Sequence, residues 1–282
     1  MTQPHLIEQI IQDVNLPRNQ RDRTTPAASS RILQRDIDGE DFDKSFDYRS
    51  VVGKLNYLEK GTRPDIAYAV HQIARFSANP KKSHGDAVIH LVKYLRATKD
   101  KGIILDPKRE KSFEVYADAD FSGNWFNRTA EHDVSTSKSR TGYLISVFGC
   151  PIIWQSKLQT QIALSTTEAE YIALSQSLRD TIPIMNLFKE LQTNGFDENY
   201  VAPKVHCKAF EDNMGALELV KVPKMRPRTK HINLVYHHFR EHVRQKEITV
   251  HPITTDNQLA DMLTKPLDQN LFQRLRKALL HW

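Results

Sequence analysis

The spacing of apolar residues divides the chain into a helical first part and a mixed second part. In residues 1–16, and in three stretches between residues 46 and 101, apolar positions recur every three or four residues, the period of an amphipathic helix. Short connections between the latter three stretches predict a small α-helical bundle over residues 46–101. The favoured interpretation of this bundle is a structural module without chemistry of its own. No period persists over residues 17–45, so we expect a surface linker there, with disorder as one option.

From residue 102 onward, stretches with a period of two alternate with helical stretches, which predicts one layered α/β domain over residues 102–282. Its core is a mixed five-stranded sheet with flanking helices, and a short additional strand is expected at residues 102–105. The strands of the sheet are expected at residues 113–120, 141–148, 151–157, 205–210 and 247–253. Helices are expected at residues 165–195, kinked or divided near Pro183, and at residues 212–220, 232–243, 257–265 and 271–279.

The stretch Phe113–Gly123 holds the first candidate for chemistry. Apolar and polar residues alternate along a strand that reaches Asp118 and continues through Asp120 into a glycine-containing loop. A carboxylate at the end of a strand is a common ligand for a hard divalent cation. Aspartate also ends many strands because it favours turns. Taken alone, the stretch leaves both interpretations open.

Three further carboxylates stand at positions where they could either bind a metal ion or have only a structural role. Glu170 borders the buried face of the long helix, Asp212 follows the fourth strand, and Asp261 lies inside a predicted helix, where aspartate has low propensity. The ordinary interpretations are a solvated helix charge for Glu170, a helix cap for Asp212 and a surface position for Asp261. If all of them converged on Asp118, they would repel one another unless cations relieved the repulsion. Two Mg²⁺ ions about 4 Å apart would suit phosphodiester hydrolysis.

Composition narrows the class of protein without deciding it. The formal net charge of +6 permits a polyanionic partner. The two cysteines, Cys150 and Cys207, give no zinc-ligand spacing and no disulfide framework, so we expect an intracellular protein, cytoplasmic or nuclear. No apolar run approaches the roughly 20 residues of a membrane helix, and the segment MTQPHLIEQI does not resemble a signal peptide, so we expect no membrane partner.

Several motifs together resemble the ribonuclease H region of copia-type retrotransposon polyproteins. They are YADADFSG, SRTGYLISVFGCPIIWQSK, STTEAEYIALS, FEDNMGAL, RTKHINLVYHHFREHV and QLADMLTKPL. The upstream segment YRSVVGKLNYLEKGTRPDIAYAVHQIARFSANPKK resembles the end of the copia reverse transcriptase, its thumb and connection, and MTQPHLIEQII resembles the piece before it. The resemblance covers nearly the whole chain except the linker, and STTEAEYIAL with LADMLTKPL is its most specific part.

The resemblance implies a ribonuclease H-like fold that cleaves the RNA strand of RNA–DNA hybrids with two Mg²⁺ or Mn²⁺ ions. The acidic metal ligands and catalytic residues of that family match Asp118, Glu170, Asp212 and Asp261 in this sequence. Asp120 is a second candidate for the first of these positions, and Glu168 is a second candidate for the second. Asp118 is the ligand expected to be shared by both ions.

Basic residues supply candidate contacts to the phosphates of a hybrid, which would position the duplex without reading its sequence. The candidates are Lys157, expected to be exposed, and the connector residues Lys224, Arg226, Arg228 and Lys230. Recognition of the hybrid would rest on duplex shape and on the 2′-hydroxyl groups of the RNA strand. The alternative for the connector is a solvated loop.

The sequence departs from the pattern of the family in three respects. Cellular ribonucleases H of this fold carry a loop histidine before the last acidic residue, whereas His251 is expected within a strand. The loop 124–137 is longer than in many copia sequences and has no assigned role. The polymerase motif YxDD is absent, so no polymerase activity is expected, and the polymerase part of the same polyprotein becomes a candidate partner. The alternative function is a non-catalytic remnant that keeps the fold and binds nucleic acid or a polymerase partner.

Overall fold

The computed structural model describes residues 1–28, 32–108, 111–126, 133–195, 205–221 and 238–282. The helical first part contains α1 (Pro4–Asp13), α2 (Tyr48–Thr62), the 3-10 turn η1 (Pro64–Ile66), α3 (Ala67–Ala74) and α4 (Lys82–Ala97). The second part begins with β1 (Phe113–Asp120), the 3-10 turn η2 (Val134–Ser137), β2 (Arg140–Val147), β3 (Cys150–Leu158) and α6 (Thr166–Thr193). It continues with β4 (Cys207–Glu211), α7 (Met214–Lys221), α8 (Arg240–Arg244), β5 (Ile248–Pro252), η5 (Thr255–Asn257), α9 (Asp261–Thr264) and α10 (Gln269–Leu280).

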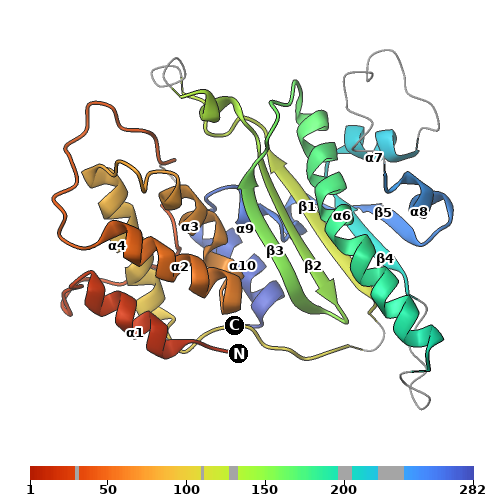
Figure 1. The fold of residues 1–282 in the computed structure, drawn as a ribbon, viewed down its shortest axis with the longest axis horizontal. Helices are drawn as coiled ribbons and strands as arrows, with labels where there is room; N and C mark the ends of the chain where they lie inside the picture. The colour runs from red at the N-terminus through yellow and green to blue at the C-terminus, as the bar shows by residue number, and fades with distance from the viewer. Residues whose placement is uncertain (29–31, 109–110, 127–132, 196–204, 222–237) are drawn as a thin grey trace.

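The five strands form one sheet in the order β3-β2-β1-β4-β5. β1 pairs with β2 and β2 with β3 in antiparallel ladders, whereas β4 is parallel to β1 and β5 is parallel to β4. This confirms the predicted mixed five-stranded sheet with flanking helices, which follows a small helical bundle in the sequence (Figure 1). Because β1 and β4 are parallel neighbours, the residues that follow them meet at one edge of the sheet.

The strand predicted at residues 102–105 is wrong. These residues belong to no strand of the described sheet. Ile103 is instead tied to the start of the chain, since its N–H donates to the carbonyl oxygen of Met1 over 3.0 Å and its carbonyl accepts from the Met1 amino group over 2.6 Å. The backbone groups of this apolar stretch are therefore partly satisfied outside the sheet.

The long helix α6 packs across one face of the sheet (Figure 1). Tyr171, Leu174 and Leu178 lie in the core that it forms with β1, β2 and β4. The helix is not divided at Pro183, which was one of the two expected outcomes, because α6 runs through that position to Thr193. Pro183 is exposed, so water can reach the carbonyl group that the proline leaves without a helical donor. The predicted helix at 232–243 lies largely outside the described residues.

The opposite face of the sheet is covered by the helical bundle together with α9 and α10 (Figure 1). Leu144 and Trp154 from the sheet share one apolar core with Leu55 of α2, Leu91 of α4 and Phe272 of α10. The N-terminal bundle and the C-terminal helix are thus parts of one core, although they lie at opposite ends of the sequence.

A buried ion pair lies within this shared core. The Arg63 guanidinium donates to both carboxylate oxygens of Asp65, over 2.9 and 2.8 Å, and both side chains are fully buried. The hydroxyl of Tyr94 on α4 donates to Asp65 and accepts from Arg276 on α10. These contacts join η1, α4 and α10 through charge-assisted hydrogen bonds.

The segment before the last helix differs from the prediction of one helix over residues 257–265. It contains η5 and the single turn α9, so that Asp261 opens a short helix instead of lying inside a longer one. α9 packs against β2 at Gly142, where a Cβ atom would lie 2.5 Å from Thr264 Cγ2 and 2.9 Å from Leu263 Cβ. Only glycine permits this close approach, which brings Asp261 beside the end of β1.

Residues 17–45, apart from the undescribed 29–31, contain no helix and run over the bundle. Arg96 on α4 holds the start of this segment, because its guanidinium donates to the Pro17 carbonyl and lies 2.6 Å from Asp22 Oδ1. Among the described helices, none combines the length and the apolar character that crossing a bilayer requires.

Candidate metal centre

Three carboxylates from distant parts of the chain converge at one edge of the sheet. Asp118 lies near the end of β1, Glu170 lies in the first turns of α6, and Asp212 directly follows β4. One oxygen of each lies within 4.8 Å of one oxygen of each of the others. The parallel pairing of β1 with β4 brings the two aspartates to the same edge, and α6 lays Glu170 across it.

Each of these three carboxylates accepts a hydrogen bond from elsewhere in the chain. The backbone N–H of Ala119 donates to Glu170 Oε2 over 2.7 Å, and the Thr264 hydroxyl donates to Asp118 Oδ2. Thr255 donates to Asp212 Oδ2 over 3.2 Å. Each carboxylate therefore keeps at least one oxygen for another ligand.

Asp261 borders this group from the side of α9. A lysine joins it to Asp118, because Lys265 Nζ lies 2.9 Å from Asp261 Oδ1 and 3.7 Å from Asp118 Oδ1. Among the described residues, neither oxygen of the buried Asp261 carboxylate has a partner in hydrogen-bond geometry. Gln258 anchors the turn before α9, since its side-chain amide donates to the Ala117 carbonyl over 2.9 Å.

Burial and mutual repulsion hold the pKa values of this cluster high. Burial raises the pKa of Asp118, against the opposing effect of Lys265. Burial, followed by the charge of Asp118, raises the pKa of Glu170 well above its usual range. The same two causes raise the pKa of Asp261 to about 7. Burial alone would lower the pKa of Lys265, but Asp118 and Asp261 outweigh it and raise that pKa.

The donor set fits hard divalent cations such as Mg²⁺ or Mn²⁺. All of its ligand atoms are carboxylate oxygens, the atoms that these ions prefer. Repelling buried carboxylates require a positive charge, and in this structure Lys265 supplies it. Asp261, whose Oδ1 is ion-paired with Lys265 and whose Oδ2 has no hydrogen-bond partner among the described residues, adds a further buried acceptor at the same place.

The two second candidates named from the sequence lie outside the converging group. Glu168 is turned toward the start of α6, where its Oε2 accepts from the Leu164 N–H over 2.8 Å while the Ser165 side chain caps the helix. Asp120 ends β1 and packs against Gly123, where a Cβ would lie 1.7 Å from its carboxylate. Burial, followed by the charge of Asp118, raises the pKa of Asp120.

Sequence reasoning missed three residues at the centre. Glu211 precedes Asp212, is fully buried, and has one oxygen, Oε2, without a hydrogen-bond partner among the described residues. Its alternation with the buried Cys207 and Ala209 along β4 was a signal in the sequence that it faces inward. Lys265 and Thr264 follow Asp261 by four and three residues, the spacing at which helical side chains meet.

The predicted phosphate contacts are only partly within the described residues. Lys157 lies on β3 and is half-buried, contrary to the expectation of exposure, and burial lowers its pKa. Lys224, Arg226, Arg228 and Lys230 lie outside the described residues. His251 lies within β5, as expected, and its Nε2 is 2.8 Å from the Thr249 hydroxyl.

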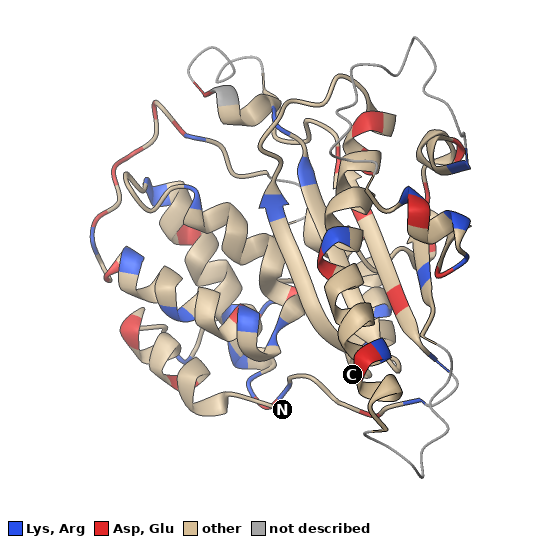
Figure 2. Cartoon of the chain, turned by 45° about the vertical axis from the view of Figure 1, so that its right-hand side comes forward, with Lys and Arg blue, Asp and Glu red and all other residues tan. Residues whose placement is uncertain are grey.

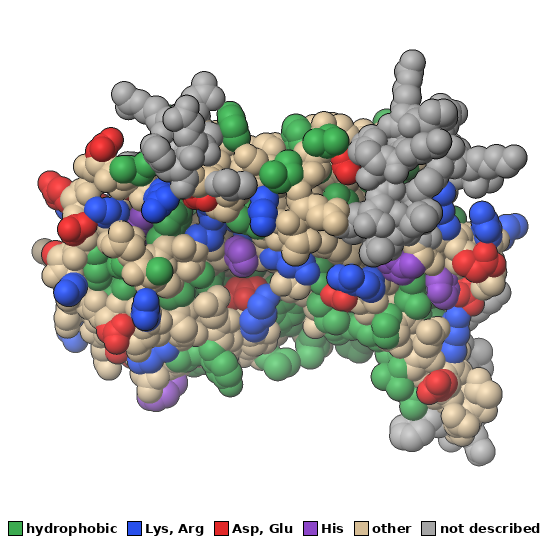
Figure 3. Space-filling view, turned by 45° about the horizontal axis from the view of Figure 1, so that its top comes forward, with side chains coloured by type: hydrophobic (Ala, Val, Ile, Leu, Met, Phe, Trp, Pro, Cys, Tyr) green, Lys and Arg blue, Asp and Glu red, His purple; other side chains and the backbone are tan. Residues whose placement is uncertain are grey.

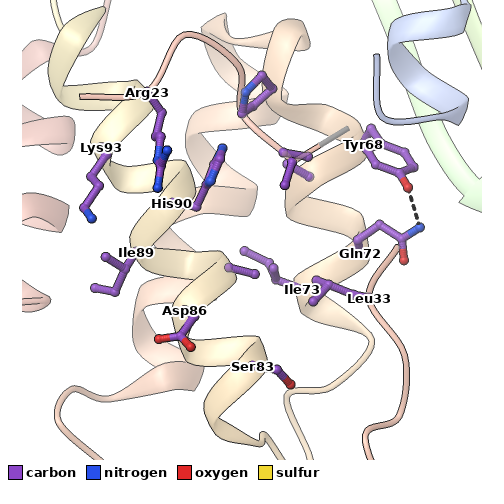
Figure 4. A pocket seen from close by; sticks show the side chains of 15 residues that line it. Arg23, Leu33, Tyr68, Gln72, Ile73, Ser83, Asp86, Ile89, His90 and Lys93 are labelled. Carbon is purple, nitrogen blue, oxygen red and sulfur yellow. Dashed lines mark hydrogen bonds between the residues drawn. The ribbon is translucent and has the colours of Figure 1, made fainter. Parts of the chain in front are cut away.

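A separate cavity of about 370 Å³ lies within the bundle, between α3, α4 and the segment that precedes them (Figure 4). Arg23, His90 and Lys93 lie toward one side of it, and Tyr68 and Gln72 toward the other. Asp86 is the one carboxylate among its described lining residues, so this cavity offers no cluster of metal ligands.

Similarity to known proteins covers almost the entire chain. A retrovirus-related Pol polyprotein from transposon TNT 1-94 of Nicotiana tabacum is 35% identical over 278 residues, which is 97% of this chain and 19% of that protein. The Pol polyprotein from transposon RE2 of Arabidopsis thaliana is 35% identical over 233 residues, 83% of this chain and 15% of that protein. The chain thus spans less than a fifth of the length of these relatives. No family model matches it.

Among solved structures, the chain is similar to an N-terminal RNase H domain from Mycobacterium tuberculosis, solved as a fusion with maltose-binding protein. The likeness covers 59% of this chain and 97% of that chain, with 12% sequence identity and a TM-score of 0.35. The mixed five-stranded sheet and its flanking helices agree with the fold that the sequence resemblance implies.

Proposed function

The chain belongs with the Pol polyproteins of copia-type retrotransposons, of which it matches one segment, and we propose that it is a ribonuclease H-type endonuclease that cuts the RNA strand of RNA–DNA hybrids. The observation that carries this proposal is the convergence of Asp118, Glu170 and Asp212 within 4.8 Å, with Asp261 beside them. These are the acidic residues that stand in the motifs shared with the family.

Asp118, Glu170 and Asp212 would hold one divalent cation, and Asp118 with Asp261 would hold a second. When bound, such ions act as Lewis acids on the scissile phosphate and lower the pKa of an attacking water. What supports the proposal of two ions is that Asp118 belongs to the group with Glu170 and Asp212 and also shares Lys265 with Asp261.

The protein's own groups prepare the centre for this chemistry. The Ala119 N–H orients Glu170, and the Thr264 hydroxyl orients Asp118, so both carboxylates are placed before substrate arrives. Lys265 neutralises part of the cluster and, being one-third exposed, can turn toward the solvent when a cation takes its place. Its ammonium group then lies close enough to the centre to attract a substrate phosphate.

A cleavage assay tests the proposal. The purified chain is incubated with a labelled RNA–DNA hybrid in Mg²⁺, alongside Asp118→Asn and the control Asp38→Asn, an exposed aspartate far along the chain from the cluster. We expect the wild type and Asp38→Asn to cut the RNA strand, and Asp118→Asn to lose at least about a hundredfold in rate. Cleavage that survives Asp118→Asn contradicts the assignment of the centre.

The same assay separates the nuclease from the alternative of a non-catalytic nucleic-acid-binding segment. If the folded wild-type chain binds the hybrid but does not cut it in either Mg²⁺ or Mn²⁺, the nuclease proposal fails and the binding function remains. RNA–RNA and DNA–DNA duplexes of the same sequence serve as substrate controls, and their cleavage at the rate of the hybrid would contradict the specificity.

A further inference from the structure

Glu211, the last residue of β4, is a buried carboxylate that the proposed function leaves without a role. Its side chain is fully buried, and Oε2 has no hydrogen-bond partner among the described residues. Oε1 accepts from the Asn213 N–H over 3.0 Å, so the chain satisfies one of the two oxygens. Because a buried carboxylate is destabilising unless it is paired, Oε2 requires a partner that the described residues do not supply.

The alternation along β4 directs Glu211 toward α6. Cys207, Ala209 and Glu211 are the fully buried positions of this strand, and Cys207 and Ala209 lie in the core that α6 covers. Asp212, the next residue, accepts instead from Thr255 in the turn η5. The two neighbouring carboxylates therefore contact different parts of the chain, although both lie at the metal centre.

The first turn of α6 lies against the residues that follow Glu211. Thr167 donates to Asn213 Oδ1 over 3.3 Å, and a Cβ atom on Gly215 would lie 2.5 Å from Thr167 Oγ1. The upper end of α6 and α7 are accordingly side by side in Figure 1. Glu170 follows Thr167 by three residues, the spacing at which helical side chains share a face, so α6 brings Glu170 to the same place.

The Glu170 side of the centre lacks the counter-charge that the other side has. Lys265 contacts Asp118 and Asp261, whereas no basic side chain among the described residues is ion-paired with Glu170 or Glu211. Burial, followed by the charges of Asp118 and Glu211, raises the pKa of Glu170, so the two glutamates are close enough to repel each other. A cation bound on this side would relieve the repulsion without displacing a lysine.

The basic residues at this end of the sheet belong to other strands. Arg140 opens β2 and Lys157 is the last residue but one of β3, and both strands lie on the opposite side of β1 from β4. Figure 2 shows basic positions (blue) at the upper ends of the two front strands. Further basic side chains are spaced across the middle of the surface in Figure 3, outside the buried cluster.

We propose that Glu211 is a positioning residue of the metal centre, whose negative charge strengthens the binding of the cation held by Glu170 and Asp212. Glu211 is not one of the three carboxylates whose oxygens lie within 4.8 Å of one another, so it acts on the ion from behind them. Its Oε2 accepts a hydrogen bond from water of the ion's hydration shell. The inference rests on the proposed function, since the cation is the one that the nuclease would use. The alternative is a protonated Glu211 that only fixes the turn before α7 through Asn213.

Calorimetric titration of the full chain with Mn²⁺ at neutral pH, without nucleic acid, tests this inference. We expect Glu211→Gln to raise the Kd of the tighter ion roughly tenfold, because the side chain keeps its size and its acceptor for the Asn213 N–H but loses its charge. Glu211→Asp, which keeps the charge, should recover most of the affinity. The matched control is Glu218→Gln at an exposed position of α7, which should leave Kd unchanged.

Melting curves in EDTA separate a role in metal binding from a role in the fold. Glu211→Gln should melt no lower than the wild type, because it removes an uncompensated buried charge, and loss of folding in this variant would overturn the inference. Unchanged Mn²⁺ affinity in Glu211→Gln, or equal losses in Glu211→Gln and Glu211→Asp, would also overturn it.

The same titration distinguishes this inference from the proposed function. A wild-type chain that binds no Mn²⁺ overturns the metal centre and the role of Glu211 together. A chain that binds Mn²⁺ with the expected dependence on Glu211 but does not cut the hybrid overturns the nuclease alone. A chain that cuts the hybrid and binds Mn²⁺ equally well with Glu211→Gln overturns only the role of Glu211.

Discussion

Lys265 places its ammonium nitrogen 2.9 Å from Oδ1 of Asp261, four residues earlier on the same turn. The same nitrogen also lies 3.7 Å from Asp118 Oδ1, so one cation serves two buried carboxylates. A positive charge at this point is what the repelling cluster needs for stability. A divalent cation bound at this centre would therefore compete with Lys265 for the same oxygens.

Replacing Lys265 is expected to separate the stabilisation that its charge provides from the stabilisation that a divalent cation would provide. Lys265→Met should lower the free energy of unfolding by about 1–3 kcal/mol without divalent ions, because two buried carboxylates lose their counter-charge. Added Mg²⁺ should then raise the Tm of the variant more than that of the wild type. Thermal melting with and without Mg²⁺ measures both effects, and Lys277→Met on the exposed side of α10 is the control. Equal Mg²⁺ shifts in all three proteins would contradict the competition.

The stability of the metal-free chain should fall as pH rises. Burial raises the pKa of Asp261 from an ordinary value of 3.8 to about 7, so the folded chain holds a proton that the unfolded chain has lost between these values. Because the folded state binds more protons there, raising the pH through this window destabilises it, by on the order of 4 kcal/mol at most for one group. The raised pKa values of Asp118 and Glu170 act in the same direction.

Melting temperatures in EDTA between pH 5 and pH 8 test this trend, which Mg²⁺ should reverse by favouring the ionised carboxylates. Asp261→Asn, which cannot ionise, should flatten the dependence. A metal-free Tm that rises steadily over this range would show that the cluster does not hold its protons.

Substitutions of the two glutamates in the motif EAE are expected to affect cleavage differently. Glu170→Gln should abolish cleavage while changing stability little, because the glutamine resembles the protonated acid favoured by burial. Glu168→Gln should keep most of the activity, since Glu168 accepts from the Leu164 N–H at the start of α6 and does not join the converging group. Cleavage rates and melting curves of both variants decide the assignment, and the reverse pattern would make Glu168 the ligand.

The buried Arg63–Asp65 ion pair of the bundle should contribute to the stability of the whole chain. Asp65→Asn leaves the fully buried Arg63 without a counter-charge and is expected to cost about 3–5 kcal/mol of stability. Because α10 shares this core, a single transition should report the loss of the bundle and of the sheet together. Chemical denaturation followed by both tryptophan fluorescence and circular dichroism measures it. Non-coincident transitions, with the sheet unaffected by Asp65→Asn, would contradict the shared core.

Local patterns were sufficient for most of the elements. The period of two in FEVYADAD predicted β1, whose first residues alternate between buried and half-buried positions. The apolar stretch TGYLISVF predicted β2, in which every residue from Arg140 to Val147 is buried. The run Ser165–Glu168 predicted the start of α6, where the Ser165 side chain accepts from the Glu168 N–H over 3.1 Å. The apolar stretch at residues 102–105 misled, since periodicity cannot show whether a neighbouring strand is present to pair with it.

The sequence by itself determined which carboxylates to consider, because Asp118, Asp212 and Asp261 each stand at a position with a distinct local pattern. Only the tertiary structure decided that Glu170 rather than Glu168 joins them, that Glu211 is buried beside them, and that Lys265 is their counter-charge. The physical reason is that these relations depend on parallel pairing of β1 with β4 and on the approach of α9 at Gly142. Such contacts join residues far apart in the chain, and no local period encodes them.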